Sequence, residues 1–218
     1  TLQCPIWITL KSEDKDLVKK FGTITLQPLQ DTIFSFASAK DKQPSMNFVI
    51  NYGDFKRKIE EHNLVLPFKK EYTVMQGFNG DFSHNTIYSR YAIDFNFKKN
   101  DTVYSADDGF VVGIIENNTK FGNDRSFTPF SNYITTYNPD SGLFCEYVHL
   151  KKNGSLVKIG DRIKKGQALA QTGMSGFMDG EHLHLNCKIP SKKGLLSTPI
   201  QFENYDASTL KKGDNVKP

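Results

Sequence analysis

The sequence predicts a mainly β protein, in which a small antiparallel β domain follows an N-terminal β-sandwich-like module. Short runs of alternating apolar and polar residues recur along the chain, as in half-buried β-strands. Glycine, proline and Asn/Asp clusters separate these runs and favour turns. The 218 residues, 38% of them hydrophobic, suit one sizeable domain or a domain with a small companion. We expect the module at residues 1–70, the main domain at 71–200 and a tail at 201–218. The sequence after Pro190 reads as polar and irregular, and we expect it to wrap the surface.

The N-terminal module reads as short strands joined by turns. Its strand-like runs include Ile6 to Leu10, where apolar residues alternate, and residues 23–29, 32–39 and 46–52. We find no group of side chains there that forms a chemical site, so the sequence leaves the role of the module open. The isolated His62 has no spaced partner nearby, and we expect a structural or solvated role for it.

The main domain begins with two candidate site residues, His84 and Asp94. A glycine-rich approach at residues 77–80 lets the backbone bend sharply before His84. In the strand at residues 90–97, Asp94 falls on the polar face, opposite a strongly apolar face. A carboxylate in this place can cap a turn, pair with Arg90 or bind a metal.

The next segments predict hairpins around a long loop. Residues 102–116 form a β-rich stretch, broken at Asp107-Asp108-Gly109, where the sequence predicts a hairpin turn. Residues 117–131 read as a loop that contains several phenylalanines. Such a loop forms the rim of a binding groove if its aromatic residues are exposed, whereas buried aromatic residues only anchor it.

A third candidate, His149, lies in a predicted strand at residues 143–150. Its side chain falls on the face opposite Phe144 and Val148, so one face of the strand is apolar and the other carries a histidine. The turns that follow, within residues 155–173, suit hairpins that close the β-fold.

Two further histidines, His182 and His184, lie two residues apart in another predicted strand. They share one face with Cα atoms about 6.5–7 Å apart, while Leu183, Leu185 and Cys187 share the other. A neutral histidine nitrogen is a common zinc ligand. The spacing leaves three interpretations open: both rings bind a metal, one binds while the other faces substrate, or both are solvated.

The polar faces together hold the components of a catalytic metal site. A catalytic zinc ion takes three protein ligands and leaves a position for a water molecule, whose pKa falls toward ~7. His84, Asp94 and either His182 or His184 supply such a ligand set. The remaining histidines are then available to transfer protons and to stabilise an oxyanion.

Four motifs follow one another along this domain: Ser83-His84, Tyr91-Ala92-Ile93-Asp94, Tyr147-Val148-His149-Leu150 and Gly180-Glu181-His182-Leu183-His184. With the connecting sequences at residues 160–167 and 173–176, they resemble the lysostaphin- and LytM-type zinc endopeptidases. The resemblance covers roughly residues 76–190.

This resemblance implies a function and a role for each site residue. His84, Asp94 and His184 would bind one Zn²⁺ ion, and His149 and His182 would form the catalytic pair. The expected reaction is hydrolysis of peptide bonds in peptidoglycan stem peptides or cross-links by metal-activated water. His149 would donate to the oxyanion, and His182 would orient the water or transfer its proton to the leaving amine.

The sequence departs from the family pattern in two places. Nine residues separate His84 from Asp94, a longer spacing than in the best-known members. This implies an inserted loop at Asn85–Arg90, which we expect to edge the groove and to alter substrate fit. Glu181 stands where a proline is frequent, and we expect little consequence.

The composition limits the classes of binding partner and the cellular locations that we expect for this chain. Lys and Arg exceed Asp and Glu by 28 to 24, a modest excess that suits an anionic polymer such as a cell wall, while no aromatic and basic stripe favours nucleic acid. We find no apolar run of about 18 residues that would span a membrane. Because the chain starts at Thr1, we expect a processed form, with any signal or anchor absent from it. We expect a location in the cell envelope, either periplasmic or secreted.

The three cysteines do not determine whether the chain folds in an oxidising or a reducing compartment.

Two alternative functions differ from a wall hydrolase. A zinc peptidase that acts on proteins would carry the same motifs. A non-catalytic envelope protein that regulates other hydrolases would have lost ligands, whereas every ligand position is filled here. The N-terminal module is free to bind the wall, to hold an envelope protein partner or to shield the groove.

Overall fold

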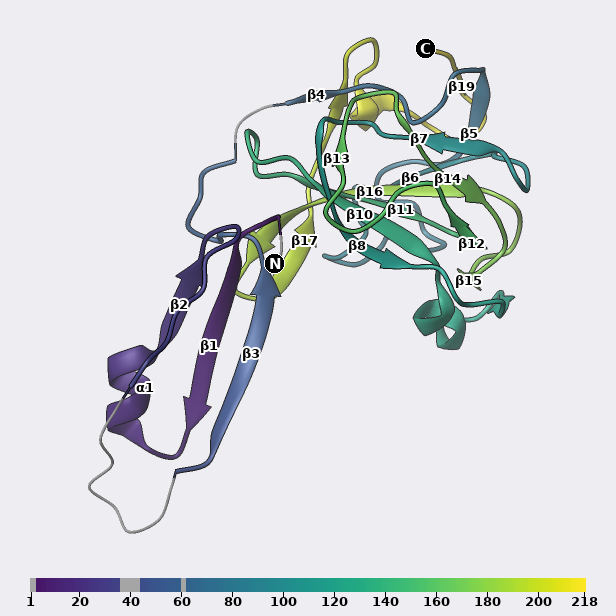
Figure 1. Ribbon diagram of the computed structural model, residues 1–218. Helices are drawn as coiled ribbons and strands as arrows, with labels where there is room; N and C mark the ends of the chain where they lie inside the picture. The colour runs from purple at the N-terminus through teal and green to yellow at the C-terminus, as the bar shows by residue number, and fades with distance from the viewer. Residues whose placement is uncertain (1–2, 36–43, 60–61) are drawn as a thin grey trace.

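The computed structural model describes residues 3–35, 44–59 and 62–218, and these form a mainly β protein (Figure 1). A three-stranded antiparallel sheet near the N-terminus extends away from a larger body of β-sheets. Among the described residues, no helix combines the length and the apolar character needed to cross a membrane.

The N-terminal sheet has the strand order β2-β1-β3. Its strands are β1 (Ile6–Ser12), β2 (Thr23–Leu26) and β3 (Met46–Tyr52). The helix α1 (Lys15–Phe21) connects β1 to β2 and buries Leu17. It begins after Asp14, whose side chain accepts hydrogen bonds from the backbone N–H groups of Asp16 and Leu17.

This region differs from the β-sandwich-like module that the sequence predicts. Residues 3–35 and 44–59 contain one sheet and one short helix, and no second sheet from these residues packs on the first. On β3 the side chains of Phe48 and Ile50 are 59% and 62% exposed, so the described part of the chain does not cover them. Of the predicted strand at residues 32–39, residues 32–35 are not in a strand, and the rest lies outside the described residues.

The main domain is built on a nine-stranded antiparallel sheet with the order β13-β8-β10-β11-β16-β6-β5-β19, in which β17 also pairs with β16. The strands are β5 (Tyr72–Gln76), β6 (Ile93–Phe95), β8 (Gly109–Ile115), β10 (Tyr133–Tyr137), β11 (Phe144–Val148), β13 (Arg162–Ile163), β16 (Leu183–Ser191), β17 (Gly194–Ser197) and β19 (Asn215–Val216).

Smaller elements complete the domain. The strands β7 (Thr102–Tyr104), β14 (Ala168–Thr172) and β12 (Leu150–Ser155) form a second antiparallel sheet. Two short parallel pairs join β9 (Phe121–Gly122) to β15 (Gly176–Phe177) and β4 (Asn63–Leu64) to β18 (Gln201–Phe202). Two 3₁₀ helices are η1 (Arg125–Phe130) and η2 (Ala207–Thr209).

On β6 and β16, the apolar faces predicted from alternation form the core. Ile93 and Phe95 on β6, and Leu183 and Leu185 on β16, are fully buried in one cluster. Since side chains alternate along a strand, Asp94 and His184 lie on the opposite face from these residues. Burial of the apolar side chains therefore sets the side of the sheet on which Asp94 and His184 lie.

The chain after Pro190, which includes the tail at 201–218, contributes to this core, although the sequence predicts a polar, irregular segment there. It contains β17, β18, η2 and β19, and it buries Phe202, Leu210 and Val216. Leu64 lies in the same cluster, beside the pairing of β4 with β18. Residues that precede the main domain and residues that follow it in the sequence therefore both pack into its core.

Candidate metal centre

Two neighbouring strands place Asp94 and His184 side by side. Asp94 on β6 lies directly opposite His184 on β16 in the antiparallel register. His84 comes from the loop between β5 and β6, where its backbone N–H donates to the carbonyl of Gly80. Its side chain is fully buried, so the loop places the ring next to these two strands and away from solvent.

Three donor atoms converge at this point. Asp94 Oδ1 lies 2.8 Å from His184 Nδ1 and 3.2 Å from His84 Nε2, and the two nitrogens are 3.2 Å apart. Neighbouring ligand atoms of a tetrahedral zinc site with bonds of about 2.0–2.1 Å lie about 3.3 Å apart. The set therefore fits a single metal ion.

The protonation of His84 supports this fit. Its Nδ1 lies 2.9 Å from the carbonyl oxygen of Gly77 and donates to it, because a carbonyl only accepts. A neutral His84 ring then directs the lone pair of Nε2 at the carboxylate of Asp94. Two electron-rich atoms at 3.2 Å need a cation between them or an added proton on the ring.

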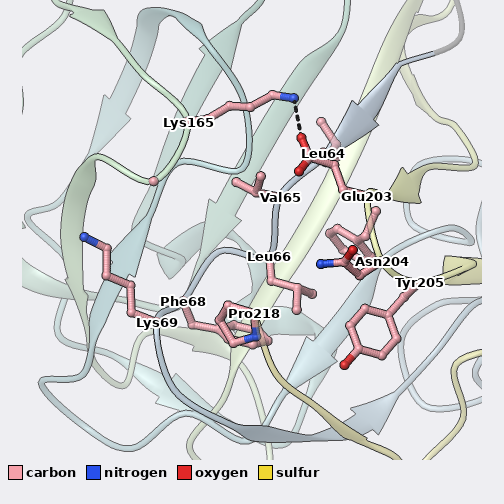
Figure 2. A pocket seen from close by; sticks show the side chains of 12 residues that line it. Leu64, Val65, Leu66, Phe68, Lys69, Lys165, Glu203, Asn204, Tyr205 and Pro218 are labelled. Carbon is pink, nitrogen blue, oxygen red and sulfur yellow. Dashed lines mark hydrogen bonds and ion pairs between the residues drawn. The ribbon is translucent and has the colours of Figure 1, made fainter.

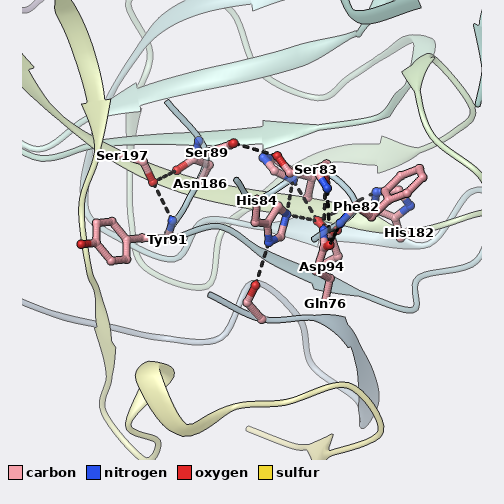
Figure 3. A network of polar contacts seen from close by, with 12 residues as sticks. Gln76, Phe82, Ser83, His84, Ser89, Tyr91, Asp94, His182, Asn186 and Ser197 are labelled. Carbon is pink, nitrogen blue, oxygen red and sulfur yellow. Dashed lines mark hydrogen bonds and ion pairs between the residues drawn. The ribbon is translucent and has the colours of Figure 1, made fainter. Parts of the chain in front are cut away.

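Gln76 on β5 holds the carboxylate from its other side (Figure 3). Its Nε2 donates to Asp94 Oδ2 at 3.0 Å and to Ser83 Oγ at 2.8 Å. Its Oε1 accepts from the backbone N–H of Phe82 at 3.1 Å. Sequence reasoning missed Gln76, because only the pairing of β5 with β6, which places it opposite Asp94, brings it to the site.

The charges in this cluster shift several pKa values. Burial raises the pKa of the Asp94 carboxyl, but His182, His84 and His184 outweigh burial and hold that pKa well below its usual range. Burial lowers the pKa of His84, while Asp94 and backbone hydrogen bonds raise it above its usual value. For His184, burial prevails over Asp94, and the pKa is lowered.

Two further rings stand beside the cluster. His149 and His182 pack edge to face with ring centroids 4.5 Å apart, and the centroid of His149 lies 6.0 Å from that of His184. The Nε2 atom of His182 is 3.9 Å from Asp94 Oδ1. Burial, followed by the nearby His182 and His184, holds the pKa of His149 well below its usual value.

Each of these rings is fixed through Nδ1. His149 Nδ1 donates to the carbonyl of Ser175 at 2.7 Å, and His182 Nδ1 donates to the carbonyl of Gly180 at 2.9 Å.

The position predicted for His149 from strand alternation is wrong, because β11 ends at Val148, and Val148 lines the same hollow as His184 while Tyr147 is buried in the core. His149 follows the strand with a φ of 66°, a left-handed conformation that is uncommon outside glycine, and its ring reaches the site through this turn and not through alternation. The Gly173 N–H donates to the His149 carbonyl at 2.9 Å and holds the turn there. Such backbone strain is concentrated at functional sites.

The site lies between two hollows. One of about 570 Å³ is lined by Asp94, His182 and Phe82, and another of about 300 Å³ by His149, His184 and Phe177. Phe82 and Phe177 stack with centroids 4.9 Å apart. Because Phe82 lines the larger hollow and Phe177 the smaller one, this aromatic pair separates the two hollows, and an extended chain has room on both sides of it.

The inserted loop lines the smaller hollow through Thr86, Tyr88 and Ser89, as the sequence predicts for a loop that edges the groove. It is folded back on itself by a hydrogen bond from the Arg90 N–H to the Thr86 carbonyl at 2.9 Å. The Asn186 side chain on β16 donates to the Tyr88 carbonyl at 2.7 Å. The loop is therefore attached to the strand that carries His184.

Other candidate features lie away from this cluster. His62 Nε2 is 2.6 Å from the buried Asp107, in keeping with a structural role. A third hollow of about 330 Å³ is lined by Leu66, Phe68 and Tyr205, with Lys165 and Glu203 paired at its edge (Figure 2). None of the five predicted site residues lines it.

The structure brings all five predicted residues together: His84, Asp94, His149, His182 and His184. Their individual roles stay predictions. The backbone carbonyls that orient the rings were not predicted, because a carbonyl has no sequence signature and its direction depends on tertiary turns.

Comparisons with known proteins show which family this chain resembles. Residues 88–195 match the family model described as peptidase family M23, a range that includes Asp94 and the three later histidines and begins four residues after His84. An uncharacterized metalloprotease from Buchnera aphidicola subsp. Baizongia pistaciae is 31% identical over 140 residues. That alignment covers 61% of this chain and 34% of the relative, so the chain spans about a third of the relative's length.

Solved structures with similar folds include a zinc-containing peptidase from Vibrio cholerae, with 21% identity, coverage of 69% of this chain and 50% of that chain, and a TM-score of 0.45. The catalytic domain of lysostaphin from Staphylococcus simulans has 21% identity, coverage of 59% and 88%, and a TM-score of 0.42.

Proposed function

The chain carries a peptidase family M23 domain at residues 88–195, and from this premise we propose that it is a zinc-dependent endopeptidase that hydrolyses peptide bonds of peptidoglycan. The proposed place of action is the cell envelope, in the periplasm or outside the cell. We propose residues 71–200 as the catalytic unit, with an N-terminal module at 1–70 and the tail at 201–218.

One observation carries the proposal. Asp94 Oδ1, His84 Nε2 and His184 Nδ1, from two strands and a loop, converge to separations of 2.8–3.2 Å. Two imidazoles and a carboxylate are the donor types that zinc takes in catalytic sites. Gln76 orients Asp94 and the Gly77 carbonyl orients His84, each through a hydrogen bond. Hydrogen bonds to the ligands have the same effect in metal enzymes.

We assign His84, Asp94 and His184 as the residues that hold the zinc ion. When bound, the ion supplies a Lewis acid that polarises the scissile carbonyl and acidifies a water molecule. Because the pKa of Asp94 is low, its carboxylate remains ionised over the working pH range and balances part of the charge of the ion.

We assign proton transfer to His149 and His182. Each ring donates through Nδ1 to a backbone carbonyl, so a neutral ring presents an unprotonated Nε2. That nitrogen accepts a proton from the attacking water and, once protonated, donates to the oxyanion or to the leaving amine. The low pKa of His149 keeps it neutral, and therefore ready to accept a proton, at neutral pH. In this proposal His149 donates to the oxyanion only after it has accepted a proton, which differs from the direct donation that the family resemblance implies.

The surroundings of the site support an extended peptide substrate. The hollows on both sides of the Phe82–Phe177 pair accommodate an extended chain. Charges of both signs line these hollows: Lys211 and Lys212 lie with Asp81 and Asp179 in the larger one, and Arg125 and the ion pair of Lys188 with Glu146 lie in the smaller one. Such linings suit a substrate with both charged and polar groups, as a peptide has.

The test uses the full chain, because Leu64 and Phe202, which lie outside residues 71–200, pack into the core of that unit. Zinc-loaded protein is incubated with intact peptidoglycan, with purified muropeptides and with unfolded casein, and mass spectrometry identifies the bonds broken. We expect new amino termini within stem peptides or cross-links. Cleavage of casein alone would replace the proposed substrate with protein, and no cleavage by a zinc-loaded, folded chain would refute the endopeptidase.

A further inference from the structure

Two cysteines lie directly opposite each other in the sheet that carries the site. Cys145 on β11 is paired with Cys187 on β16, and both are buried free thiols. The third cysteine, Cys4, is buried in a separate apolar cluster. The proposed mechanism uses none of the three.

The backbone hydrogen bonds show which kind of pair the two cysteines form. The carbonyl of Cys187 accepts from the Thr198 N–H at 3.0 Å, on the β17 side of β16. The carbonyl of Cys145 accepts from Thr136 Oγ1 at 3.4 Å, on the β10 side of β11. Since the N–H and C=O of one strand residue point to the same side, each cysteine directs its backbone groups away from the other.

Cys145 and Cys187 are therefore a non-hydrogen-bonded pair. The Cα atoms of such a pair lie about 4.5 Å apart, closer than those of a hydrogen-bonded pair. Disulfides bridge Cα atoms about 4.4–6.8 Å apart. The register thus brings the two thiols within bonding reach without a shift of either strand.

We infer that Cys145 and Cys187 form a disulfide when the chain folds in an oxidising compartment, a setting that rests on the proposed envelope function. The reaction is thiol–disulfide exchange with a small or protein disulfide as the oxidant. The two thiols lose two protons and two electrons to form the S–S bond, and the oxidant disulfide is reduced to two thiols.

The bond closes during folding rather than afterwards. Burial, and then the neighbouring Cys187 thiol, raise the pKa of Cys145 well above its usual value, so its thiolate is scarce once the sheet is formed. The thiolate is the attacking species in exchange. Exposed thiols in the partly folded chain react first, and the pairing of β11 with β16 then selects the partner.

The cross-link stabilises the strand register on which the metal centre depends. His184 pairs with Val148 in the same ladder as the cysteines, and His149 follows β11 directly. A one-residue slip between β11 and β16 would turn His184 to the other face. A covalent bond between Cys145 and Cys187 prevents that slip.

The experiment refolds the full chain from denaturant in glutathione redox buffer and, in parallel, in excess dithiothreitol. Free thiols are then alkylated under denaturing conditions, and digests are mapped without reduction. We expect the oxidised sample to be lighter by about 2 Da before alkylation, with a Cys145–Cys187 peptide and an alkylated Cys4. We also expect a melting temperature about 5–10 °C higher than that of the reduced sample.

Two variants sharpen the result. Cys4→Ser should retain the cross-link, and Cys187→Ser should lose it; if Cys187→Ser does not fold, the wild-type peptide map still decides. Three alkylated thiols in the folded, oxidised protein, or a bond that includes Cys4, would overturn the inference. Because the map does not use activity, hydrolysis without the cross-link refutes the inference alone, and the cross-link without hydrolysis refutes the proposed function alone.

Discussion

Asp94 Oδ1 and His184 Nδ1 lie 2.8 Å apart, because the register of β6 against β16 sets the two residues directly opposite each other. Each residue has buried apolar neighbours on its own strand, Ile93 and Phe95 beside Asp94, and Leu183 and Leu185 beside His184. The apolar packing that stabilises the sheet therefore also holds two of the proposed metal ligands at coordinating distance.

Loss of the carboxylate should remove the metal. Asp94→Ala takes away one donor and the negative charge that faces three histidines. We expect no retained zinc after gel filtration and hydrolysis at background level. Metal content by mass spectrometry, measured with turnover of muropeptides, checks this. Asp31→Asn, an exposed carboxylate in the N-terminal region, is the control, and a zinc-replete Asp94→Ala protein would rule out this ligand.

Loss of His149 should separate catalysis from metal binding. The His149 ring centroid is 6.0 Å from that of His184, and its Nδ1 is held by Ser175. His149→Ala should keep one zinc ion per chain and lower kcat by about 10²–10⁴-fold, the usual contribution of a positioned acid–base group. Zinc retention with full activity would show that His149 transfers no proton.

Gln76 should tune the affinity for the metal. Gln76→Leu removes the donor to Asp94 Oδ2 and leaves that oxygen without this partner. We expect zinc affinity to fall by about 10–100-fold, as for other outer hydrogen bonds in metal sites. Competition titration with a chromophoric chelator measures the change. Gln201→Leu, at an exposed position on β18, should have no effect; equal affinities for Gln76→Leu and the parent would place Gln76 outside the metal centre.

Zinc affinity should fall as the pH is lowered. A proton competes with zinc for His84 Nε2, and the raised pKa of His84 extends that competition above about pH 6.5, the usual value for histidine. The low pKa of Asp94 means that its carboxylate does not take up a competing proton in this range. Calorimetry in buffers of different ionisation enthalpy should detect proton release on binding. An affinity that is constant between about pH 8 and pH 5.5 would contradict the assignment.

The inserted loop should contribute to substrate binding and not to zinc binding. Tyr88 lines the hollow beside His149 and His184, and its side chain is 48% exposed. Tyr88→Ala should raise KM several-fold for muropeptides and keep kcat and zinc content, because it removes contacts made equally in ground and transition states. Tyr52→Ala, at an aromatic residue on β3 of similar exposure (44%), is the matched control. Loss of zinc in Tyr88→Ala would reassign the loop to the support of the metal centre.

Much of this arrangement could be predicted from the sequence, because strand alternation sorts side chains by face. The pattern around Asp94 and around His184 predicts which side of each strand is polar, and both sides are as predicted. Alternation carries no information about which strands are neighbours, so the contact of Gln76 with Asp94 could not be predicted.

The other features that differ from the sequence prediction also depend on contacts between segments far apart in the sequence or on local caps. The direction of the His149 ring depends on the Ser175 carbonyl, which a separate turn supplies. In the N-terminal region, α1 follows an Asp14 cap and buries Leu17, a helical turn within a stretch that otherwise favours strands. The tail reads as polar, yet the apolar Phe202 and Val216 within it reach the core.

The most direct test of the central claim is anomalous diffraction at the zinc edge from crystals of the zinc-loaded chain. We expect one strong peak within bonding distance of His84 Nε2, Asp94 Oδ1 and His184 Nδ1, with His149 and His182 beside it and unligated. A folded protein with no peak there, or with its zinc bound by other side chains, would contradict the proposed metal centre and the hydrolytic function built on it.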